Sequence, residues 1–141
     1  MSILTDAIVE VRKALLADEV VKKHCPADHV VPLYFTEDFE KEGTTIDMGD
    51  YIVMAHEGLH FDDNKFGVYN ETYHMLVNCV STDYDSSLEM AEAVRRILLR
   101  LQNTSDRNIA ITDFRGEAAE FNGRLRYVQI LRYDYGEVNP I

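Results

Sequence analysis

The residues with the clearest chemical potential form one short motif near the middle of the chain. Residues 56–60 spell His-Glu-Gly-Leu-His and match the pattern H-E-x-x-H. On a helix, this spacing places two imidazoles on one face, where they bind zinc, and the intervening glutamate acts as general base on the metal-bound water. The motif raises the hypothesis of a small zinc-dependent hydrolase that uses His56, Glu57 and His60.

The sequence around the motif does not favour the helix that this chemistry needs. Residues 51–54 are rich in β-forming side chains, Gly58 costs about 1 kcal/mol of helix propensity relative to alanine, and residues 61–67 predict a turn. No downstream motif identifies a third zinc ligand. Glu71 or Asp83 could serve, but nothing in the sequence favours either residue. We therefore predict a protein that is not an enzyme, with no catalytic residue, metal or cofactor. The zinc hydrolase stays as the alternative.

Other reactive groups in the sequence are sparse. The chain has no glycine-rich phosphate loop, no G-x-S-x-G and no C-x-x-C. With no export signal at the N-terminus, we expect Cys25 and Cys79 to be free thiols in a reducing cytosol. The cations Lys22 and Lys23 favour a lower pKa for Cys25, but nothing marks it as a nucleophile. We expect both cysteines to be structural.

The charge balance excludes one class of partner. The 141 residues carry 25 acidic and 14 basic side chains, a net charge of −11. Sequence-independent binding to nucleic acid depends on Lys and Arg that neutralise phosphates, so we do not expect it here. Residues 37–63 hold nine acids against Lys41 alone. We interpret this segment as solvated loops around a buried strand at 51–55, with an assembly surface or channel lining as the alternative.

Hydrophobic periodicity predicts the elements that would position these side chains. Residues 4–20 repeat apolar side chains at helical spacing, and Pro26 sets the latest plausible helix end. Residues 30–35 suggest an edge strand. Residues 73–81 alternate with period two, so Tyr73, Met75, Val77 and Cys79 share one face and His74, Leu76, Asn78 and Val80 share the other.

The second half of the chain predicts a helix followed by a β meander. Ser86 and Glu89 fit a capping box at the helix start, and Leu88, Ala91, Val94, Leu98 and Leu101 form its apolar stripe. Residues 109–114 and 118–121 are candidate strands. Asn122-Gly123 is a hairpin signal, and residues 125–135 form the closing strand. We predict one soluble α+β domain over residues 1–141: an antiparallel or mixed sheet with two main helices on one face.

This layout resembles a family of phage proteins. The resemblance is carried by the N-terminal helix, the strand at 51–53, the central strand at 73–80, the helix at 86–98 and the closing strand at 124–130. It spans most of the chain and consists of hydrophobic patterning with few fixed residues. In these features the chain is similar to the tail terminator, or tail completion, proteins of long-tailed phages and prophages.

The resemblance implies a structural role. Such a protein forms a ring, expected to be a hexamer, that ends growth of the tail tube and joins it to the head connector. The expected partners are the tail tube protein, the connector proteins and DNA that passes through the lumen without specific binding, with no membrane. The expected location is the virion tail, assembled in the host cytoplasm. The acidic segment 37–63 departs from the family pattern, and in a ring it could line the lumen or meet a neighbouring protein.

Overall fold

The structure is a computed structural model that describes residues 3–32, 49–63, 69–121 and 123–136. Its helices are α1 (Ile3–Ala17), α2 (Glu19–His24) and α4 (Tyr84–Thr104), with a 3-10 turn, η1 (Ala27–His29). Its strands are β1 (Val30–Pro32), β2 (Tyr51–Asp63), β3 (Tyr69–Ser81), β4 (Asn108–Phe121) and β5 (Arg124–Gly136). None of the described helices is long and apolar enough to cross a membrane.

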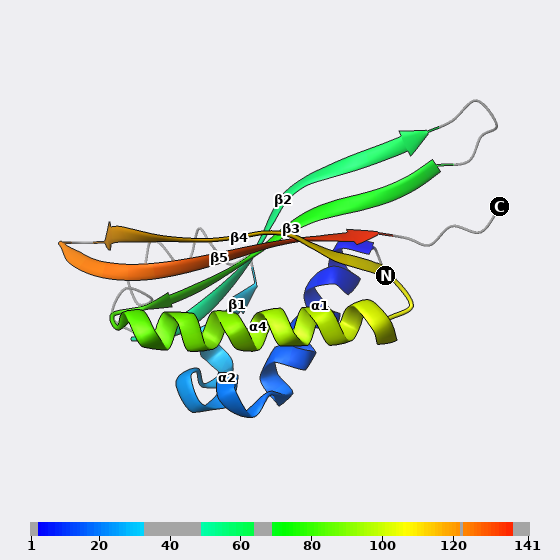
Figure 1. Cartoon of the computed structure of the whole chain (residues 1–141). Coiled ribbons are helices and arrows are strands. Elements are labelled where there is room, and N and C mark those ends of the chain that lie inside the picture. Colours follow the sequence, from blue (N-terminus) through cyan, green and yellow to red (C-terminus); the bar gives the residue numbers. More distant parts are fainter. Residues whose placement is uncertain (1–2, 33–48, 64–68, 122, 137–141) are drawn as a thin grey trace.

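The five strands form one mixed sheet in the order β1-β2-β3-β5-β4. β1 pairs with β2 in parallel, and every other neighbouring pair is antiparallel. Figure 1 shows α1 and α4 on the same side of this sheet. The prediction of an α+β fold, with a mixed sheet and two main helices on one face, is therefore confirmed.

The predicted N-terminal helix is divided in two. α1 ends at Ala17, and Asp18 adopts an extended conformation whose side chain accepts hydrogen bonds from the backbone N–H groups of Val20 and Val21. These are the first orphan donors of α2, so Asp18 is an N-cap that starts a second helix. The sequence correctly places the end before Pro26 but does not reveal the break.

The start of α4 also differs from the prediction. Asp83 is the N-cap, because its carboxylate accepts hydrogen bonds from the Ser86 N–H at 3.0 Å and the Ser86 hydroxyl at 2.9 Å. The proposed capping box of Ser86 and Glu89 is wrong. The Glu89 carboxylate instead forms an ion pair with Lys23, whose Nζ lies 3.1 Å away. The predicted apolar stripe is correct, since Ala91, Val94 and Leu98 are fully buried.

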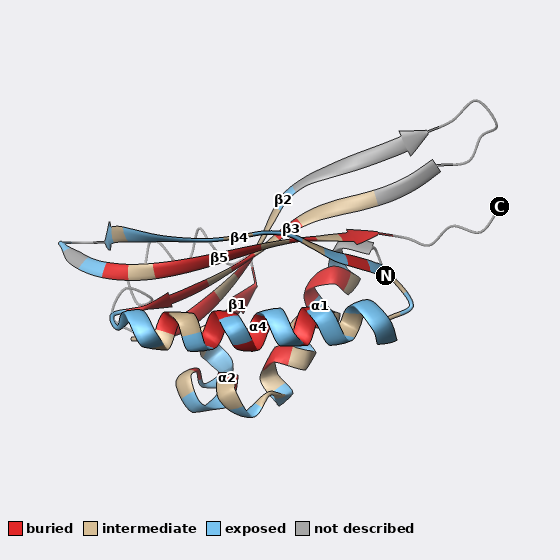
Figure 2. Cartoon of the chain, viewed as in Figure 1, coloured by how far each residue is buried: buried red, intermediate tan, exposed pale blue. Residues whose placement is uncertain are grey.

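Alternation along the strands gives the sheet two distinct faces. Met75, Val77, Cys79, Leu131 and Tyr133 are completely buried and face α1 and α4. Figure 2 shows the buried residues concentrated between the helices and the sheet. The intervening residues of the same strands lie on the opposite face, which we call the open face. The face assignments predicted for residues 73–80 are confirmed.

β2 and β3 continue past the rest of the sheet as a two-stranded arm. We define the arm as residues 61–63 and 69–71, which pair with one another from Phe61↔Glu71 to Asp63↔Tyr69. β5 accompanies β3 only as far as the pair Thr72↔Gly136, and Figure 1 shows the hairpin projecting from the body. The prediction of a turn at 61–67 is wrong for residues 61–63, which are strand.

β4 is one continuous strand where the sequence predicts two. Its register with β5 shifts between Ile111 and Asp113, and the strand then runs on through Gly116. A side chain at Gly116 would meet the Gln129 amide oxygen at 2.5 Å, so the glycine leaves room for Gln129 rather than ending the strand. Gly123 has a φ of +76° at the hairpin end, as the predicted turn requires. Asn122 and residues 33–48, which hold five of the nine acids of segment 37–63, lie outside the described residues.

Candidate functional site

The H-E-x-x-H motif lies on strand β2 instead of on a helix. Successive strand residues rise about 3.3 Å, so positions four apart are separated by roughly 13 Å. A register shift between His56 and Gly58 also interrupts the alternation. The motif therefore lacks the backbone geometry that brings two imidazoles to one zinc ion, and the zinc-hydrolase alternative loses its structural basis.

The described side chains of the motif point to opposite faces. His56 pairs with Met75 in the core register, and its ring centroid lies 5.5 Å from that of Tyr73. Glu57 is on the open face, where its carboxylate lies 2.7 Å from Arg132 Nη2. Within the described part of the chain, no group of three His, Cys, Asp or Glu residues could hold a metal ion. In the structure, the His56 ring of the motif packs against Tyr73, and Glu57 forms an ion pair with Arg132.

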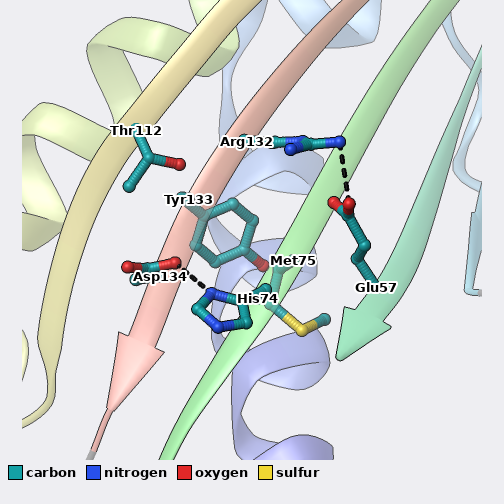
Figure 3. Close-up of a pocket in the computed structure, with 7 residues that line it drawn as sticks. All are labelled: Glu57, His74, Met75, Thr112, Arg132, Tyr133 and Asp134. Carbon is teal, nitrogen blue, oxygen red and sulfur yellow. Dashed lines mark hydrogen bonds and ion pairs between the residues drawn. The ribbon is translucent and has the colours of Figure 1, made fainter. Parts of the chain in front are cut away.

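A constellation of charged and titratable side chains lies at the root of the arm, on the open face. A hollow of about 440 Å³ is lined there by Glu57, His74, Thr112, Arg132 and Asp134, among others. Figure 3 shows two interactions across it: Glu57 with Arg132, and His74 Nδ1 with Asp134 at 2.7 Å. We call these four charged or titratable residues, from β2, β3 and β5, the arm-root quartet.

The sheet register explains how the quartet forms. His74 and Asp134 are direct cross-strand partners, and Arg132 pairs with Leu76, so its long side chain reaches across β3 to Glu57 on β2. The Arg132 and Glu57 side chains remain 37% and 38% exposed, so water and salt screen their attraction. Arg132 Nε has no hydrogen-bond partner among the described residues. This Nε atom is itself buried, so the ion pair with Glu57 is made by the outer end of the guanidinium.

The quartet does not form a nucleophilic catalytic triad. A His–Asp pair can activate a hydroxyl only when the imidazole contacts that hydroxyl. Thr112 lines the same hollow, but Figure 3 shows its side chain apart from the His74 ring, with no interaction drawn between them. The arrangement is better suited to recognising a polar or charged group than to acyl transfer.

A second polar cluster surrounds Asp50, where β2 begins. Its carboxylate accepts hydrogen bonds from the Ser81 hydroxyl at 2.5 Å and His24 Nδ1 at 3.0 Å, and its backbone carbonyl accepts one from His29 Nδ1 at 2.9 Å. Although Ser, His and Asp are all present, the aspartate stands between the other two. The cluster connects α2 and η1 to the end of the sheet. Asp50, one acid of the segment interpreted as solvated loops, therefore has a structural role.

The two cysteines lie in the apolar layer beside this cluster. Cys25 is 2% exposed and Cys79 fully buried. Burial, and secondarily the nearby Asp50, raises the pKa of the Cys25 thiol to about 12. The expectation that lysines would lower this pKa is wrong, because desolvation disfavours the thiolate more strongly. Burial also raises the pKa of Cys79. Both thiols are structural, as predicted.

The arm-root quartet was not found by sequence reasoning. Of its members, only Glu57 was considered for chemistry, and for a different role. Arg132 and Glu57 are far apart in sequence, and their contact depends on a register that no local pattern reveals. The available signal was weak: Arg132 and Asp134 are charged residues that alternate with Leu131, Tyr133 and Tyr135.

Comparisons with known proteins give a similarity at the level of the fold. No protein-family model and no curated protein matches this sequence. Among solved structures, the fold is similar to that of a chain described as "Virion of native gene transfer agent (GTA) particle". The two chains are 14% identical with a TM-score of 0.58, and the match covers 90% of this chain and 91% of the other. At this identity, the match establishes a shared fold over nearly the full length of both chains.

Proposed function

We propose that this protein is a structural subunit of a phage tail, which forms a ring that terminates the tail tube and joins it to the head connector. The observation that carries the proposal is the shared fold with a virion chain across 90% of this chain and 91% of the other. The sequence pattern resembles tail terminators over the same elements. Two independent comparisons, one of pattern and one of fold, thus favour a virion component.

The arrangement of charges is compatible with this role. The cluster at Asp50 is used to hold α2 and η1, and the charged groups of the quartet are paired with one another. The open face bears polar groups at intermediate exposure, a composition suited to a wet interface between subunits. On this proposal the whole chain acts as one domain and works through assembly, with the tail tube and connector proteins as neighbours.

The test is the native mass, measured by light scattering after size exclusion over a wide range of concentrations. A hexamer of the 16.2 kDa chain has a mass of about 97 kDa, six times that of the monomer. We expect this species, and closed rings by negative-stain electron microscopy. A chain that stays monomeric at every concentration, and forms no rings when mixed with purified tail tubes, would overturn the proposal.

The acidic segment provides a second test of the same function. As part of the proposal, it lines the lumen or meets a neighbouring protein, and an acidic lumen lets DNA slide because like charges do not bind. Replacing Glu37, Asp38, Glu40 and Glu42 by their amides should leave the circular dichroism spectrum unchanged but impair assembly or DNA passage. Normal infectious particles from this variant would count against the role of the segment.

A further inference from the structure

The hollow at the arm root is shaped by two β-bulges that meet at the same level of the sheet. Each of the register shifts in β2 and β4 inserts one extra residue, which is Glu57 in β2 and Thr112 in β4. Both insertions lie beside the cross-strand pair Met75↔Tyr133, and both inserted residues line the hollow. Figure 3 shows them on opposite sides of the hollow. Because bulges re-aim side chains near functional sites, two bulges at one hollow indicate a surface shaped for a ligand.

The carboxylates of the hollow retain hydrogen-bonding capacity. Glu57 contacts Arg132, and Asp134 contacts His74. The described part of the chain supplies no further hydrogen bond or ion pair to either carboxylate, and none to the Thr112 side chain. An ionised carboxylate has two oxygens with about four acceptor positions, so one partner leaves most of them to solvent or to a ligand.

The charge of the hollow favours a cationic ligand with several donors. The hollow contains two carboxylates against the guanidinium of Arg132, and that guanidinium already lies 2.7 Å from Glu57. The whole chain carries a net charge of −11, so it repels anions. A guanidinium group offers five N–H donors in a planar fork that fits carboxylate oxygens. A polar hollow of about 440 Å³ can admit such a group together with water.

The same charge imbalance suggests a source for the guanidinium. Copies that each carry −11 repel one another, so a contact between copies must bring cations of one to carboxylates of the other. Arg100 on α4 and Arg115 on β4 are exposed, and the described part of the chain gives them no hydrogen bond or ion pair. The other arginines with described side chains each have such a contact.

We propose that the arm-root hollow of one copy binds an arginine side chain of a second copy, supplied by Arg100 or Arg115. The guanidinium lies between the carboxylates of Glu57 and Asp134, and the Thr112 hydroxyl accepts a further N–H. This inference rests on the proposed function in one respect, the self-association of the chain, and it names the residues that meet in that contact. With Arg100 the contact joins the open face to the helix layer, two different surfaces, as a ring requires.

Removal of one carboxylate charge is the first test. Glu57→Gln and Asp134→Asn should each raise the concentration at which the assembly half-dissociates by about three- to tenfold, because each removes one charged acceptor at a partly exposed site. Light scattering over a dilution series measures this shift. Glu117→Gln is the matched control, since Glu117 is exposed on the same face of β4 but does not line the hollow.

A charge swap between chains is the decisive test. Asp134→Arg places a cation in the hollow, and Arg100→Asp or Arg115→Asp reverses the incoming charge. Asp134→Arg alone and the correct donor variant alone should fail to assemble, because like charges then meet. An equal mixture of the two should recover the assembly and thereby identify the donor. Lys13→Asp, which reverses another exposed cation on α1, should neither dissociate the wild-type assembly nor rescue Asp134→Arg.

Folding and template effects are controlled separately. Circular dichroism and thermal melts check that each variant is folded. If Asp134→Arg does not fold, Glu57→Arg replaces it, since it introduces the same repulsion from a different strand. The same series is repeated with purified tail tubes, so that an assembly that forms only on a tube is also tested.

The remaining outcomes separate this inference from the proposed function. A hexamer that persists in Asp134→Arg, with the mass distribution of the wild type, would leave the ring standing and overturn the contact proposed here. Dissociation by Asp134→Arg without rescue by Arg100→Asp or Arg115→Asp would overturn the assignment of the donor and, with it, the inference. A wild-type chain that stays monomeric both alone and with tail tubes would remove the inference and the proposed function together.

Discussion

The two faces of the sheet are built from alternate residues of the same strands, yet at the root of the arm they differ in chemistry. Toward the helices, Met75, Leu131 and Tyr133 are fully buried in one continuous apolar cluster. On the opposite face, the next residues along are His74, Arg132 and Asp134, which are partly exposed and joined in ion pairs. At the arm root the open face is therefore available for contact, whereas further along the same face Tyr51, Val80, Val128 and Ile130 are buried in a second apolar cluster.

The comparison separates stability from assembly. Burial of apolar surface contributes roughly 25 cal/mol per Å², whereas exposed ion pairs contribute little. Changes on the helix-covered face should then act on the free energy of unfolding. Changes at the partly exposed arm-root quartet should leave that free energy nearly unchanged and, on the proposed function, act on the oligomer.

The largest expected effect is at the centre of the helix-covered face. Leu131→Ala should lower the free energy of unfolding by about 2–5 kcal/mol, because it removes a fully buried side chain and leaves a cavity. Urea denaturation followed by circular dichroism measures the change. Leu125→Ala is the matched control, since Leu125 lies on the same strand at 54% exposure and should change stability by less than about 0.5 kcal/mol. Equal losses in the two variants would contradict the difference in burial between Leu131 and Leu125.

The next effect tests the tight contact between β4 and β5. Gly116→Ala places a methyl group against Gln129, whose side chain is buried and donates a hydrogen bond to the Ser87 hydroxyl at 3.3 Å. We expect a loss of about 1–3 kcal/mol, typical of overpacking. In the background of Gln129→Ala the same substitution should cost much less, since the clashing amide is gone. Additive losses in the double variant would rule out the proposed clash.

Asp18 gives a smaller, pH-dependent effect within the helix layer. Its carboxylate caps α2 and lies 3.0 Å from Arg96 Nη2 on α4. Burial raises the Asp18 pKa, but the N–H groups of Val21 and Val20 and the Arg96 guanidinium outweigh it, so the pKa is lowered overall. Asp18→Ala should cost about 1 kcal/mol at neutral pH, as typical for loss of an N-cap.

The sign of the pH dependence follows from the lowered pKa. The charge-dependent stabilisation from Asp18 is fully present above its unfolded pKa of about 4 and is lost as the pH falls through the lower folded pKa. The stability difference between wild type and Asp18→Asn should therefore shrink in acid. Glu19→Gln, beside it and 89% exposed, is the control that should show little difference at any pH. A difference that grows as the pH falls would contradict this account.

The helix-covered face was the more predictable of the two. The period-two alternation of residues 73–80 and the stripe of α4 identify core residues, because burial imposes a local pattern on each element. Residues 61–63 are predicted as turn and form strand, since Asp62 and Asp63 interrupt any apolar alternation and the pairing with residues 69–71 holds the segment extended. Gly116 was similarly interpreted as a gap between strands, because the side chain that fills its space belongs to β5.

The candidate site was less predictable for the same physical reason. The H-E-x-x-H spacing is informative only on a helix, and the backbone around it is strand. The contacts that replace it join Glu57 to Arg132 and His74 to Asp134, across three strands. Glu89 shows the same limitation: its position suggested a local cap, but Lys23 and His24 from another helix lie beside it. Contacts that depend on tertiary register leave no mark on sequence spacing.

The smallest expected effect on stability, and the sharpest contrast with Leu131→Ala, comes from the arm-root quartet. Glu57→Gln, Arg132→Gln and the double variant form a cycle around one partly exposed ion pair. Each single change should alter the free energy of unfolding by less than about 1 kcal/mol, with a coupling of roughly 0.2–1 kcal/mol between the two sites, because solvent screens the pair. If the open face serves assembly, the same variants should shift the mass distribution measured by light scattering, with Leu125→Ala again as the control. A coupling of several kcal/mol would show that the open face helps to stabilise the fold, and the separation of roles between the two faces would have to be abandoned.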